Sequence, residues 1–320
     1  MHSVPVVAAS LAFLSAAASS PAQQYPTRPV RLVVPSSPGG TSDILGRLLA
    51  QKFTEGLGQQ VVAENRPGAS SVIGADAVAK SAPDGYTLLI SPAALAINPH
   101  MYAKMPFDAR RDLAPVSLVV QTGNLLAAHP SLPARSVREL IALARKNPGK
   151  LTSASPGLGG SPHMAAELMK FMAGIDFLIV SYKGSGPGTI ALLSGEVSFM
   201  FSTPPSAIPF VKAGRLRALG VTTRTRMPGL PEVPSLHETL PGYEATQWFG
   251  LLAPAGTPQP VIERLYQETV RAVRAPDMTA RLVAEGLEPV ASRPEEFAAY
   301  IRSELDKWAK VIQAAGIKAQ

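Results

Sequence analysis

Short apolar runs alternate with helical patterns through the first third of the chain. The run 30–34 has the Val and Leu content of a buried strand, and the apolar residues of 44–53 recur near the 3.6-residue period of one helix face. The alternation continues with an apolar run at 61–63, a helical pattern at 75–80 and an apolar run at 86–90. Strands that alternate with helices predict an α/β fold with a largely parallel sheet.

A second series with the same alternation begins near residue 125. Ser136 and Glu139 have the spacing of a capping box, which predicts a helix from that point to about Lys146. The further elements predicted in this series are a helix at 164–172 and strands at 151–154, 175–180, 197–201 and 216–221. Together with the first series, they predict two α/β lobes.

From Pro254 onward the pattern is mostly helical. Ser292-Arg293-Pro294-Glu295 has the spacing of a second capping box, ahead of a long terminal helix to about Ala314. A helical tail cannot form a sheet of its own, so we expect it to pack on the first lobe. The expected organisation is a discontinuous first domain at 23–122 and 248–320, a second domain at 123–247, and chain crossings near 118–124 and 240–250.

The N-terminus has the pattern of a secretory signal peptide. The segment 4–18 is an almost unbroken run of apolar and small residues, and 19–23 supplies a small-x-small site with cleavage after Ala22. We therefore expect 1–22 to be a signal peptide and the mature protein to be periplasmic. The alternative is a buried or anchoring N-terminal helix, because the residues before the apolar run include no Lys or Arg.

Composition excludes several classes of function. The 320 residues include no cysteine, which removes disulfides, thiolate metal sites and a cysteine nucleophile. The formal net charge is +7, but Lys and Arg are spread along the whole chain without a nucleic-acid-binding motif, so no nucleic-acid partner is expected. A positive surface suits anionic solutes.

Two loops rich in glycine and serine follow predicted strands and precede predicted helices. They are Ser36-Ser37-Pro38-Gly39-Gly40-Thr41-Ser42-Asp43 and Ser155-Pro156-Gly157-Leu158-Gly159-Gly160-Ser161-Pro162-His163. Glycines allow tight turns and close approach to a ligand, and the first N–H groups of a helix are unpaired at the positive end of its dipole. Each loop is a candidate site for an anionic group, and one loop in each lobe predicts a clamp. Neither loop has a P-loop or dinucleotide fingerprint.

Several polar residues of these loops have a second interpretation as structural residues. Ser161 is placed as an N-cap with a proline at the first helical position, and Thr41 and Ser42 allow the same interpretation. Asp43 complements the helix dipole, whereas facing an anionic ligand it would repel the ligand unless water or an amino group lay between them. His163 lies in a first helical turn, where the dipole disfavours its protonation. It either donates to the ligand as a neutral ring or packs the loop.

An ordered set of short motifs covers nearly the whole expected mature chain. The motifs are Tyr25-Pro26 with Arg28-Pro29, Val34-Pro35-x-x-Pro38-Gly39-Gly40 with Asp43, Leu57-Gly58-Gln59, Glu64-Asn65-Arg66-Pro67-Gly68-Ala69, Pro83-Asp84-Gly85-Tyr86-Thr87-Leu88-Leu89, Asn98 with Tyr102 and Asp108, Pro148-Gly149-Lys150-Leu151, Gly157-x-Gly159-Gly160-Ser161-Pro162-His163, Tyr182-Lys183-Gly184, Val233-Pro234, and Pro241-Gly242-Tyr243-Glu244 with Trp248. In this order they resemble the Bug family, the TctC-like periplasmic receptors of tripartite tricarboxylate transporters. The resemblance implies a Venus-flytrap receptor of type II-like fold, which holds a carboxylate between two lobes and presents it to membrane permease subunits.

The resemblance also implies which residues bind the ligand. One jaw would be formed by Ser37, Gly39, Gly40, Thr41 and Asp43, and the other by Ser155, Gly157, Gly159, Gly160, Ser161 and His163. The candidates for the cleft wall are Asn98, Tyr182, Ser202 and Thr203. Many members of the family have an aromatic residue just before the first loop, where this chain has Ser36. An aromatic lid over the ligand is therefore not expected.

The sequence does not indicate an enzyme. The segment 159–163 is the nearest approach to a serine-hydrolase elbow, but a serine followed by proline at a helix start is a cap. The histidines lie far apart in sequence and lack metal-ligand spacing, so neither a metal nor another cofactor is expected. We expect a monomeric receptor whose partners are a small organic acid and membrane permease subunits. The alternative is a ligand-sensing subunit that signals through a membrane sensor kinase.

Overall fold

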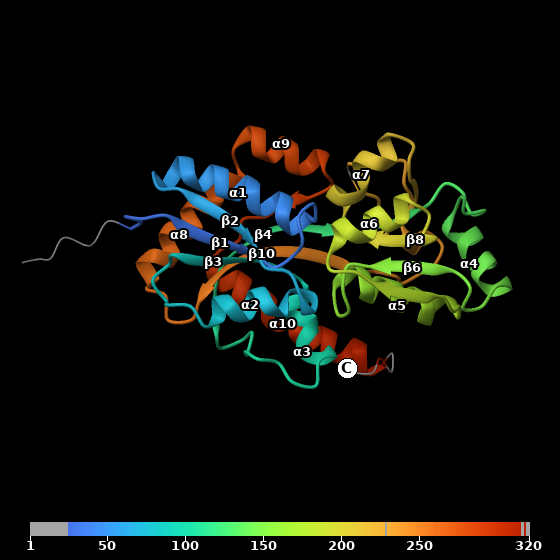
Figure 1. Ribbon diagram of the computed structural model, residues 1–320, viewed down its shortest axis with the longest axis horizontal. Helices are drawn as coiled ribbons and strands as arrows, with labels where there is room; N and C mark the ends of the chain where they lie inside the picture. The colour runs from blue at the N-terminus through green and yellow to red at the C-terminus, as the bar shows by residue number, and fades with distance from the viewer. Residues whose placement is uncertain (1–24, 228, 315–316, 318–320) are drawn as a thin grey trace, which may run out of the picture.

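The computed structural model describes residues 25–227, 229–314 and 317. Two α/β lobes lie side by side along the long axis of the molecule (Figure 1), and each contains one sheet covered by helices. The predicted two-lobed α/β fold is confirmed. The expected signal peptide falls outside the described residues. No helix in the described part of the chain is both long and apolar enough to cross a membrane.

Lobe 1 is built on a six-stranded sheet. Its strands are β1 (Val30–Val34), β2 (Val61–Asn65), β3 (Thr87–Pro92), β4 (Leu113–Gly123), β10 (Thr246–Pro254) and β11 (Glu288–Pro289). The order is β11-β4-β10-β3-β1-β2, with β1 parallel to β2 and β3, and β10 antiparallel to β3 and β4. The parallel part corresponds to the apolar runs at the start of the chain, and β10 joins it from the second half. The prediction of a largely parallel sheet is wrong for this lobe, because β10 pairs antiparallel with β3 and β4, and β11 pairs antiparallel with β4.

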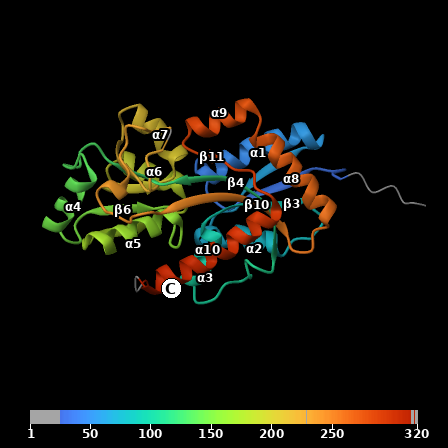
Figure 2. The same ribbon diagram turned by 180° about the vertical axis from the view of Figure 1, so that it is seen from behind.

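Helices cover both faces of this sheet (Figures 1 and 2). One face carries α1 (Thr41–Leu57), α8 (Gln259–Val273) and α9 (Pro276–Ala284), and the other carries α2 (Val72–Ala79), α3 (Ala94–Met101) and α10 (Pro294–Ala314). Successive residues of a strand point to opposite faces. Leu32 accordingly packs in the same core as Leu45 and Phe53 of α1, whereas its neighbour Val33 packs in the core that contains α2 and α10.

The C-terminal helix α10 packs on lobe 1. The ring of Phe297 lies edge-to-face against Trp248 of β10, with ring centroids 5.5 Å apart. The buried carboxylate of Glu304 accepts hydrogen bonds from the indole N–H groups of Trp248 and Trp308, each at 3.2 Å. Both tryptophans of the chain therefore report on the contact between α10 and β10.

The predicted capping box before α10 is wrong by one residue. The side chain of Glu296, rather than that of Glu295, accepts from the backbone N–H of Arg293 at 2.9 Å. The Ser292 hydroxyl is occupied elsewhere, because it accepts from the backbone N–H of Leu118 on β4 at 3.1 Å. The hydrogen bond between Ser292 and β4 thus takes the place of the predicted N-cap hydrogen bond within α10.

Lobe 2 has a five-stranded sheet in the order β7-β6-β8-β5-β9. Its strands are β5 (Leu125–Ala128), β6 (Thr152–Ser155), β7 (Leu178–Ser181), β8 (Phe199–Ser202) and β9 (Arg217–Val221). The core on one face includes α4 (Val137–Lys146) and α5 (Ser161–Ala173), and the core on the other includes α6 (Ser185–Leu193) and α7 (Pro204–Lys212). Of the predicted capping box before α4, the N-cap is confirmed, since Ser136 Oγ accepts from the Glu139 N–H at 3.1 Å. The reciprocal bond is shifted by one residue, because Glu139 Oε2 accepts from the Arg135 N–H at 2.7 Å.

Two connections join the lobes. One passes through Asn124 between β4 and β5, and the other passes from β9 through the segment 222–245 into β10. The Asn124 N–H donates to Thr222 Oγ1 at 2.6 Å, and the same hydroxyl donates to the Ala245 carbonyl at 2.6 Å. These bonds tie the two connections together. The exact domain boundaries expected from the sequence stay a prediction.

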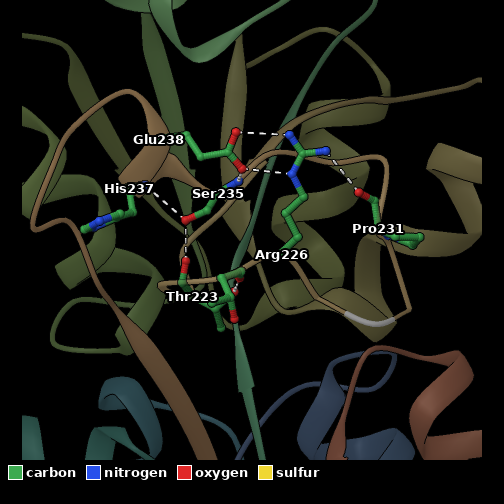
Figure 3. A network of polar contacts seen from close by, with 7 residues as sticks. Thr223, Arg226, Pro231, Ser235, His237 and Glu238 are labelled. Carbon is green, nitrogen blue, oxygen red and sulfur yellow. Dashed lines mark hydrogen bonds and ion pairs between the residues drawn. The ribbon is translucent and has the colours of Figure 1, made fainter.

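The segment that leads into β10 is fixed by a polar network (Figure 3). Arg226 donates to both carboxylate oxygens of Glu238, at 2.8 and 3.0 Å, and this hydrogen bonding is the main reason why the pKa of Glu238 falls to about 2. Ser235 Oγ accepts from the His237 N–H and donates to the Thr223 carbonyl. The segment therefore reaches the sheet in a defined conformation.

Candidate functional site

A cavity of about 350 Å³ lies between the lobes. Its walls include the carboxyl ends of β1, β3, β6 and β7 or the residues directly after them. Open α/β sheets bind ligands in this position. Six of the predicted ligand residues line the cavity, namely Gly40, Thr41, Gly157, Gly160, Tyr182 and Thr203.

Four helices begin at the cavity wall. The N-cap residues are Gly40 for α1, Gly160 for α5, Gly184 for α6 and Thr203 for α7, and all four line the cavity. The first N–H groups of α1, α5 and α6 have no partner within the helix and carry the positive end of its dipole, whereas α7 begins with Pro204 and Pro205, which have no N–H, and adds only its dipole. Among the described lining residues Lys183 alone is charged. The cavity is therefore suited to an anionic group.

The two glycine loops have almost the same backbone conformation. The first glycine is left-handed in both, with φ of 81° at Gly39 and 76° at Gly159. The second glycine is extended in both, with φ and ψ of −82° and 163° at Gly40 and −86° and 162° at Gly160. Only glycine adopts the left-handed conformation without steric cost. The similarity that the sequence suggested thus extends to the backbone geometry.

One side chain anchors each loop from the first turn of its helix. Asp43 Oδ2 accepts from the Gly39 N–H at 3.0 Å, and His163 Nδ1 accepts from the Gly159 N–H at 3.3 Å. Both side chains are buried, and neither residue lines the cavity. Their geometry supports the structural interpretation of both residues.

The carboxylate of Asp43 is satisfied within lobe 1. It accepts from Arg47 Nε at 3.0 Å and from Asn65 Nδ2 at 2.9 Å. Burial raises the pKa of Asp43, but the hydrogen bonds from Arg47, the Gly39 N–H and Asn65 outweigh burial and hold the pKa below its usual value. The ionised group is therefore neutralised by Arg47.

The ring of His163 is neutral at pH 7. Burial, aided by the positive charge of Lys170, lowers the pKa of His163 to about 4. Because Nδ1 accepts from the Gly159 N–H, the ring proton lies on Nε2, which is 3.8 Å from Glu167 Oε1. The dipole argument from the sequence and the burial in the structure agree on a neutral ring.

We expect this ring to make stability pH-dependent. The folded pKa of about 4 lies below the ordinary histidine pKa of 6.5, so the unfolded chain binds more protons between these pH values. Stability should fall by an amount on the order of 3 kcal/mol as pH drops from 6.5 to 4, with no further loss from this group below that pH. His163→Asn keeps an acceptor for the Gly159 N–H and removes the titration. Urea unfolding of both proteins at pH 7, 5.5 and 4 measures the difference, and parallel pH profiles would contradict the assignment.

Hydroxyl groups join the lobes beside the cavity. The Ser37 hydroxyl donates to the Lys183 carbonyl, and the hydroxyl oxygens of Thr41 and Thr203 lie 2.5 Å apart. Ser37 and Thr41 belong to lobe 1, and Lys183 and Thr203 to lobe 2. The structure therefore shows the two lobes in direct contact.

Glycines lie at two close approaches between the lobes. A Cβ atom at Gly186 would lie 2.6 Å from the Pro38 carbonyl oxygen, and one at Gly159 would lie 2.6 Å from Asn98 Oδ1. Real Cβ atoms essentially never come within 3.0 Å of such an atom. Side chains at these positions would keep the lobes apart.

Ser161 has a different role from the predicted cap. Gly160 is the N-cap of α5, and no side chain caps this end. The Ser161 hydroxyl donates to the Thr246 carbonyl at 2.8 Å and accepts from Asn124 Nδ2 at 2.9 Å. It therefore links the second loop to both connections between the lobes.

The other predicted residues do not line the cavity. The predicted residues outside the lining are Ser37, Gly39, Asp43, Asn98, Ser155, Gly159, Ser161, His163 and Ser202. Ser155 Oγ donates to the Gly157 carbonyl at 2.8 Å, and Asn98 Nδ2 donates to the Ser70 carbonyl at 2.8 Å. Their assignment as ligand residues stays a prediction.

A third loop also lines the cavity. Its residues were not among the ligand residues predicted from the sequence. It comprises 67–71, in which Ala69, Ser70 and Ser71 all have positive φ, at 45°, 49° and 80°. Non-glycine residues rarely adopt such values, and they concentrate at functional sites. The Pro67-Gly68 pair signals a turn, but no local pattern distinguishes it from an ordinary connection.

Ser36 also lines the cavity, in the place where many relatives were expected to have an aromatic residue. Its Oγ is buried and has no partner within the described chain. The cavity wall is thus polar and small at this point. No group of three or more His, Cys, Asp or Glu side chains that could hold a metal occurs in the part of the chain that the structure describes.

The family of receptors of tripartite tricarboxylate transporters, TctC, matches residues 45–317. The chain belongs to the TctC family. It is 40% identical over 311 residues to a Pseudomonas protein from the tcbD-tcbE intergenic region, covering 96% of this chain and 93% of that protein. It is 36% identical to BugT of Bordetella pertussis, covering 98% and 97% of the two chains. The resemblance stated from the sequence motifs is confirmed.

Solved structures of similar proteins have the same fold. A protein of R. palustris with adipate has a TM-score of 0.90 at 37% identity, covering 92% of this chain and all of that one. The periplasmic binding protein BugD has a TM-score of 0.90 at 31% identity over the same shares. MatC from Rhodopseudomonas palustris with bound malate has a TM-score of 0.84 at 30% identity, covering 90% and 100%. TctC-family proteins are periplasmic solute receptors rather than enzymes, as the sequence predicted.

Proposed function

We propose that this receptor captures a small carboxylate in the cavity between its lobes. The observation that carries the proposal is the convergence of four helix N-termini, of which those of α1, α5 and α6 offer backbone N–H groups, on a cavity without an acidic side chain among its described lining residues. Charge-assisted hydrogen bonds from backbone N–H groups are strong in such a site. The adipate and malate in the two similar structures are carboxylates, which supports the same class of ligand here.

Ligand binding would act on the equilibrium between open and closed lobes. A carboxylate that accepts bonds from both glycine loops gains them only when the lobes are together, so it stabilises the closed state. Asp43 and His163 hold the loops in the conformation that presents their N–H groups. The protein therefore holds the loop N–H groups in position before binding, and the ligand links the two loops by accepting from both.

The proposed partner is the membrane permease of a tripartite transporter, to which the monomeric receptor delivers its ligand. The family description supports this partner. We also propose that the leader is cleaved near Ala22, so that the mature chain works in the periplasm. Residues Ser37, Gly39, Gly40, Thr41, Gly157 and Gly160 remain the proposed core of the binding site.

A thermal-shift screen tests the ligand class. The mature chain from Gln23 is mixed with straight-chain mono- and dicarboxylates and with their amides. A ligand at 100 times its Kd adds about 2.7 kcal/mol to stability, so a binding acid should raise Tm by about 5–10 °C for a protein of this size. The corresponding amides should give no shift. A panel in which no acid raises Tm, or in which the amides match the acids, would overturn the carboxylate proposal.

A further inference from the structure

Ser36 presents an unpaired hydroxyl group to the cavity. It follows Pro35 just after the end of β1, and both residues line the cavity. The Oγ atom of Ser36 is buried and has no hydrogen-bond partner among the described residues. The backbone at this point is held in place, because the Ser36 carbonyl accepts from Asn65 Nδ2 at 3.0 Å. The hydroxyl therefore has a defined position but no protein group to bond to.

The partner of this hydroxyl has to come from the contents of the cavity. A serine hydroxyl donates one hydrogen bond and accepts up to two, and buried polar groups nearly always have a partner in protein, water or ligand. An apolar ligand group that displaced water from Ser36 would leave the hydroxyl unpaired, which is unfavourable. The cavity thus favours a ligand that carries a polar group of its own beside Ser36.

The Ser36 hydroxyl lies next to the first glycine loop. A Cβ atom added to Gly40, the N-cap of α1, would lie 3.6 Å from Ser36 Oγ. In the proposed function, the ligand carboxylate accepts from the N–H groups at the start of this helix. A polar group beside Ser36 is therefore one that the ligand carries close to its carboxylate.

Ser70 brings a second hydroxyl group to the other glycine loop. A Cβ atom added to Gly157 would lie 3.1 Å from Ser70 Oγ, and one added to Gly160 would lie 3.8 Å from it. Ser70 lines the cavity with φ of 49°, between two further non-glycine residues of positive φ. Backbone strain of this kind concentrates at functional sites, where the surrounding structure maintains it. Here the Ser70 carbonyl accepts from Asn98 Nδ2 at 2.8 Å. Hydroxyl groups thus lie beside both glycine loops.

We infer that the receptor selects 2-hydroxy acids over the corresponding unsubstituted acids, and that Ser36 bonds to the ligand hydroxyl. This inference rests on the proposed carboxylate function. The glycine loops bind the carboxylate, and the hydroxyl on the adjacent carbon shares a hydrogen bond with Ser36 Oγ. A site that hydrogen-bonds a ligand hydroxyl rejects the analogue without it, because the protein group is then left unpaired. Since Ser36 lies on one side of the bound acid, one enantiomer should be preferred.

Two sets of acids and three variants isolate this contact. One set is succinate with D- and L-malate, the other is propionate with D- and L-lactate, and each hydroxy acid differs from its parent by one hydroxyl. Ser36→Ala removes the protein hydroxyl, and Ser36→Cys keeps most of its volume with a much weaker hydrogen-bonding group. Ser153→Ala is the matched control, because Ser153 Oγ is also buried without a partner but lies on β6 outside the cavity lining. Calorimetric titration at pH 8, where all these acids are ionised, measures the affinities.

The expected result is a change of preference rather than a general loss of binding. Wild type and Ser153→Ala should bind one enantiomer of a hydroxy acid about 5- to 150-fold more tightly than its parent acid, the range that an unpaired buried polar group implies. Ser36→Ala should lose most of this preference and most of the discrimination between enantiomers, and Ser36→Cys should retain only part of both. The parent acid should bind Ser36→Ala at least as tightly as wild type, because no hydroxyl is then left unpaired.

The possible failures can be told apart. If no carboxylate binds wild type, the proposed function is overturned and the inference with it. If carboxylates bind but no enantiomer of malate or lactate binds more tightly than its parent acid, the inference alone is overturned. It is also overturned if Ser36→Ala keeps the full preference, or if Ser36→Ala weakens hydroxy and parent acids alike, since Ser36 would then bond to the carboxylate itself. Thermal unfolding of the ligand-free variants verifies folding, and Ser36→Cys decides the question should Ser36→Ala not fold.

Discussion

Replacing Gly186 by alanine is expected to weaken ligand binding by about 5- to 150-fold without lowering the Tm of the ligand-free protein. Gly186 lies in the first turn of α6, and its added Cβ would stand 2.6 Å from the Pro38 carbonyl oxygen of the other lobe. Overpacking of this kind typically costs about 1–3 kcal/mol, which corresponds to the stated range of affinities. A backbone carbonyl cannot rotate away as a flexible side chain can.

The substitution should affect closure of the two lobes without affecting the folding of either lobe. Alanine is a better helix former than glycine by up to about 1 kcal/mol, so lobe 2 itself should not be destabilised. Gly188→Ala is the matched control in the same helix, because its Cβ would meet Met200 and Ala154 of its own lobe. Calorimetric titration and thermal unfolding of both variants provide the measurements. Equal affinities of Gly186→Ala and wild type would show that the ligand does not require this approach of the lobes.

Local signals were sufficient to predict the first loop and its helix. Leu45, Leu49 and Phe53 recur at the helical period, and all three are fully buried against the sheet. The order of strand, glycine loop and helix then placed both loops at the carboxyl ends of strands. These features depend on residues close in sequence, which is why the pattern contains them.

The other two helix N-termini at the cavity could not be predicted in this way. α6 begins with Ser-Gly-Pro-Gly and α7 with Pro-Pro, compositions that favour turns over helices. They are helical because Leu192 and Ile208 are buried in the core of lobe 2. Packing between distant segments overrides the local preference, and only the folded structure reveals it.

Gln247 and Ser161 illustrate the same limit for individual side chains. Gln247 lines the cavity, and the bonds that orient its side chain include one from Ala93, 154 residues away in sequence. Ser161 allowed a local cap, but its hydroxyl bonds to the Thr246 carbonyl, 85 residues away. Sequence spacing identifies which residues are polar and near a loop, whereas the fold decides which of them face the ligand.

Replacing Asp43 by alanine is expected to lower the free energy of unfolding by about 2–4 kcal/mol. The substitution removes the acceptor of the Gly39 N–H, of Arg47 and of Asn65, and it leaves part-buried donors without partners. Urea unfolding measures the loss. Arg47→Ala is the comparison variant, because the Arg47 side chain is 56% exposed and Asp43 keeps its bonds from the Gly39 N–H and Asn65, so the loss should be smaller than for Asp43→Ala.

The effect of Asp43→Ala on affinity distinguishes the two interpretations of this residue. If the carboxylate anchors the loop, its removal lets the Gly39 segment move, and the ligand must order that segment on binding, so acid binding becomes weaker. If the carboxylate instead faced the ligand, its removal would relieve repulsion between like charges and acid binding would become tighter. Since Asp43 accepts from Gly39, Arg47 and Asn65 and lies outside the cavity lining, we expect the weaker binding. Calorimetric titration of Asp43→Ala and Asp43→Asn with one acid gives the sign, and tighter binding in both would assign the residue to the ligand.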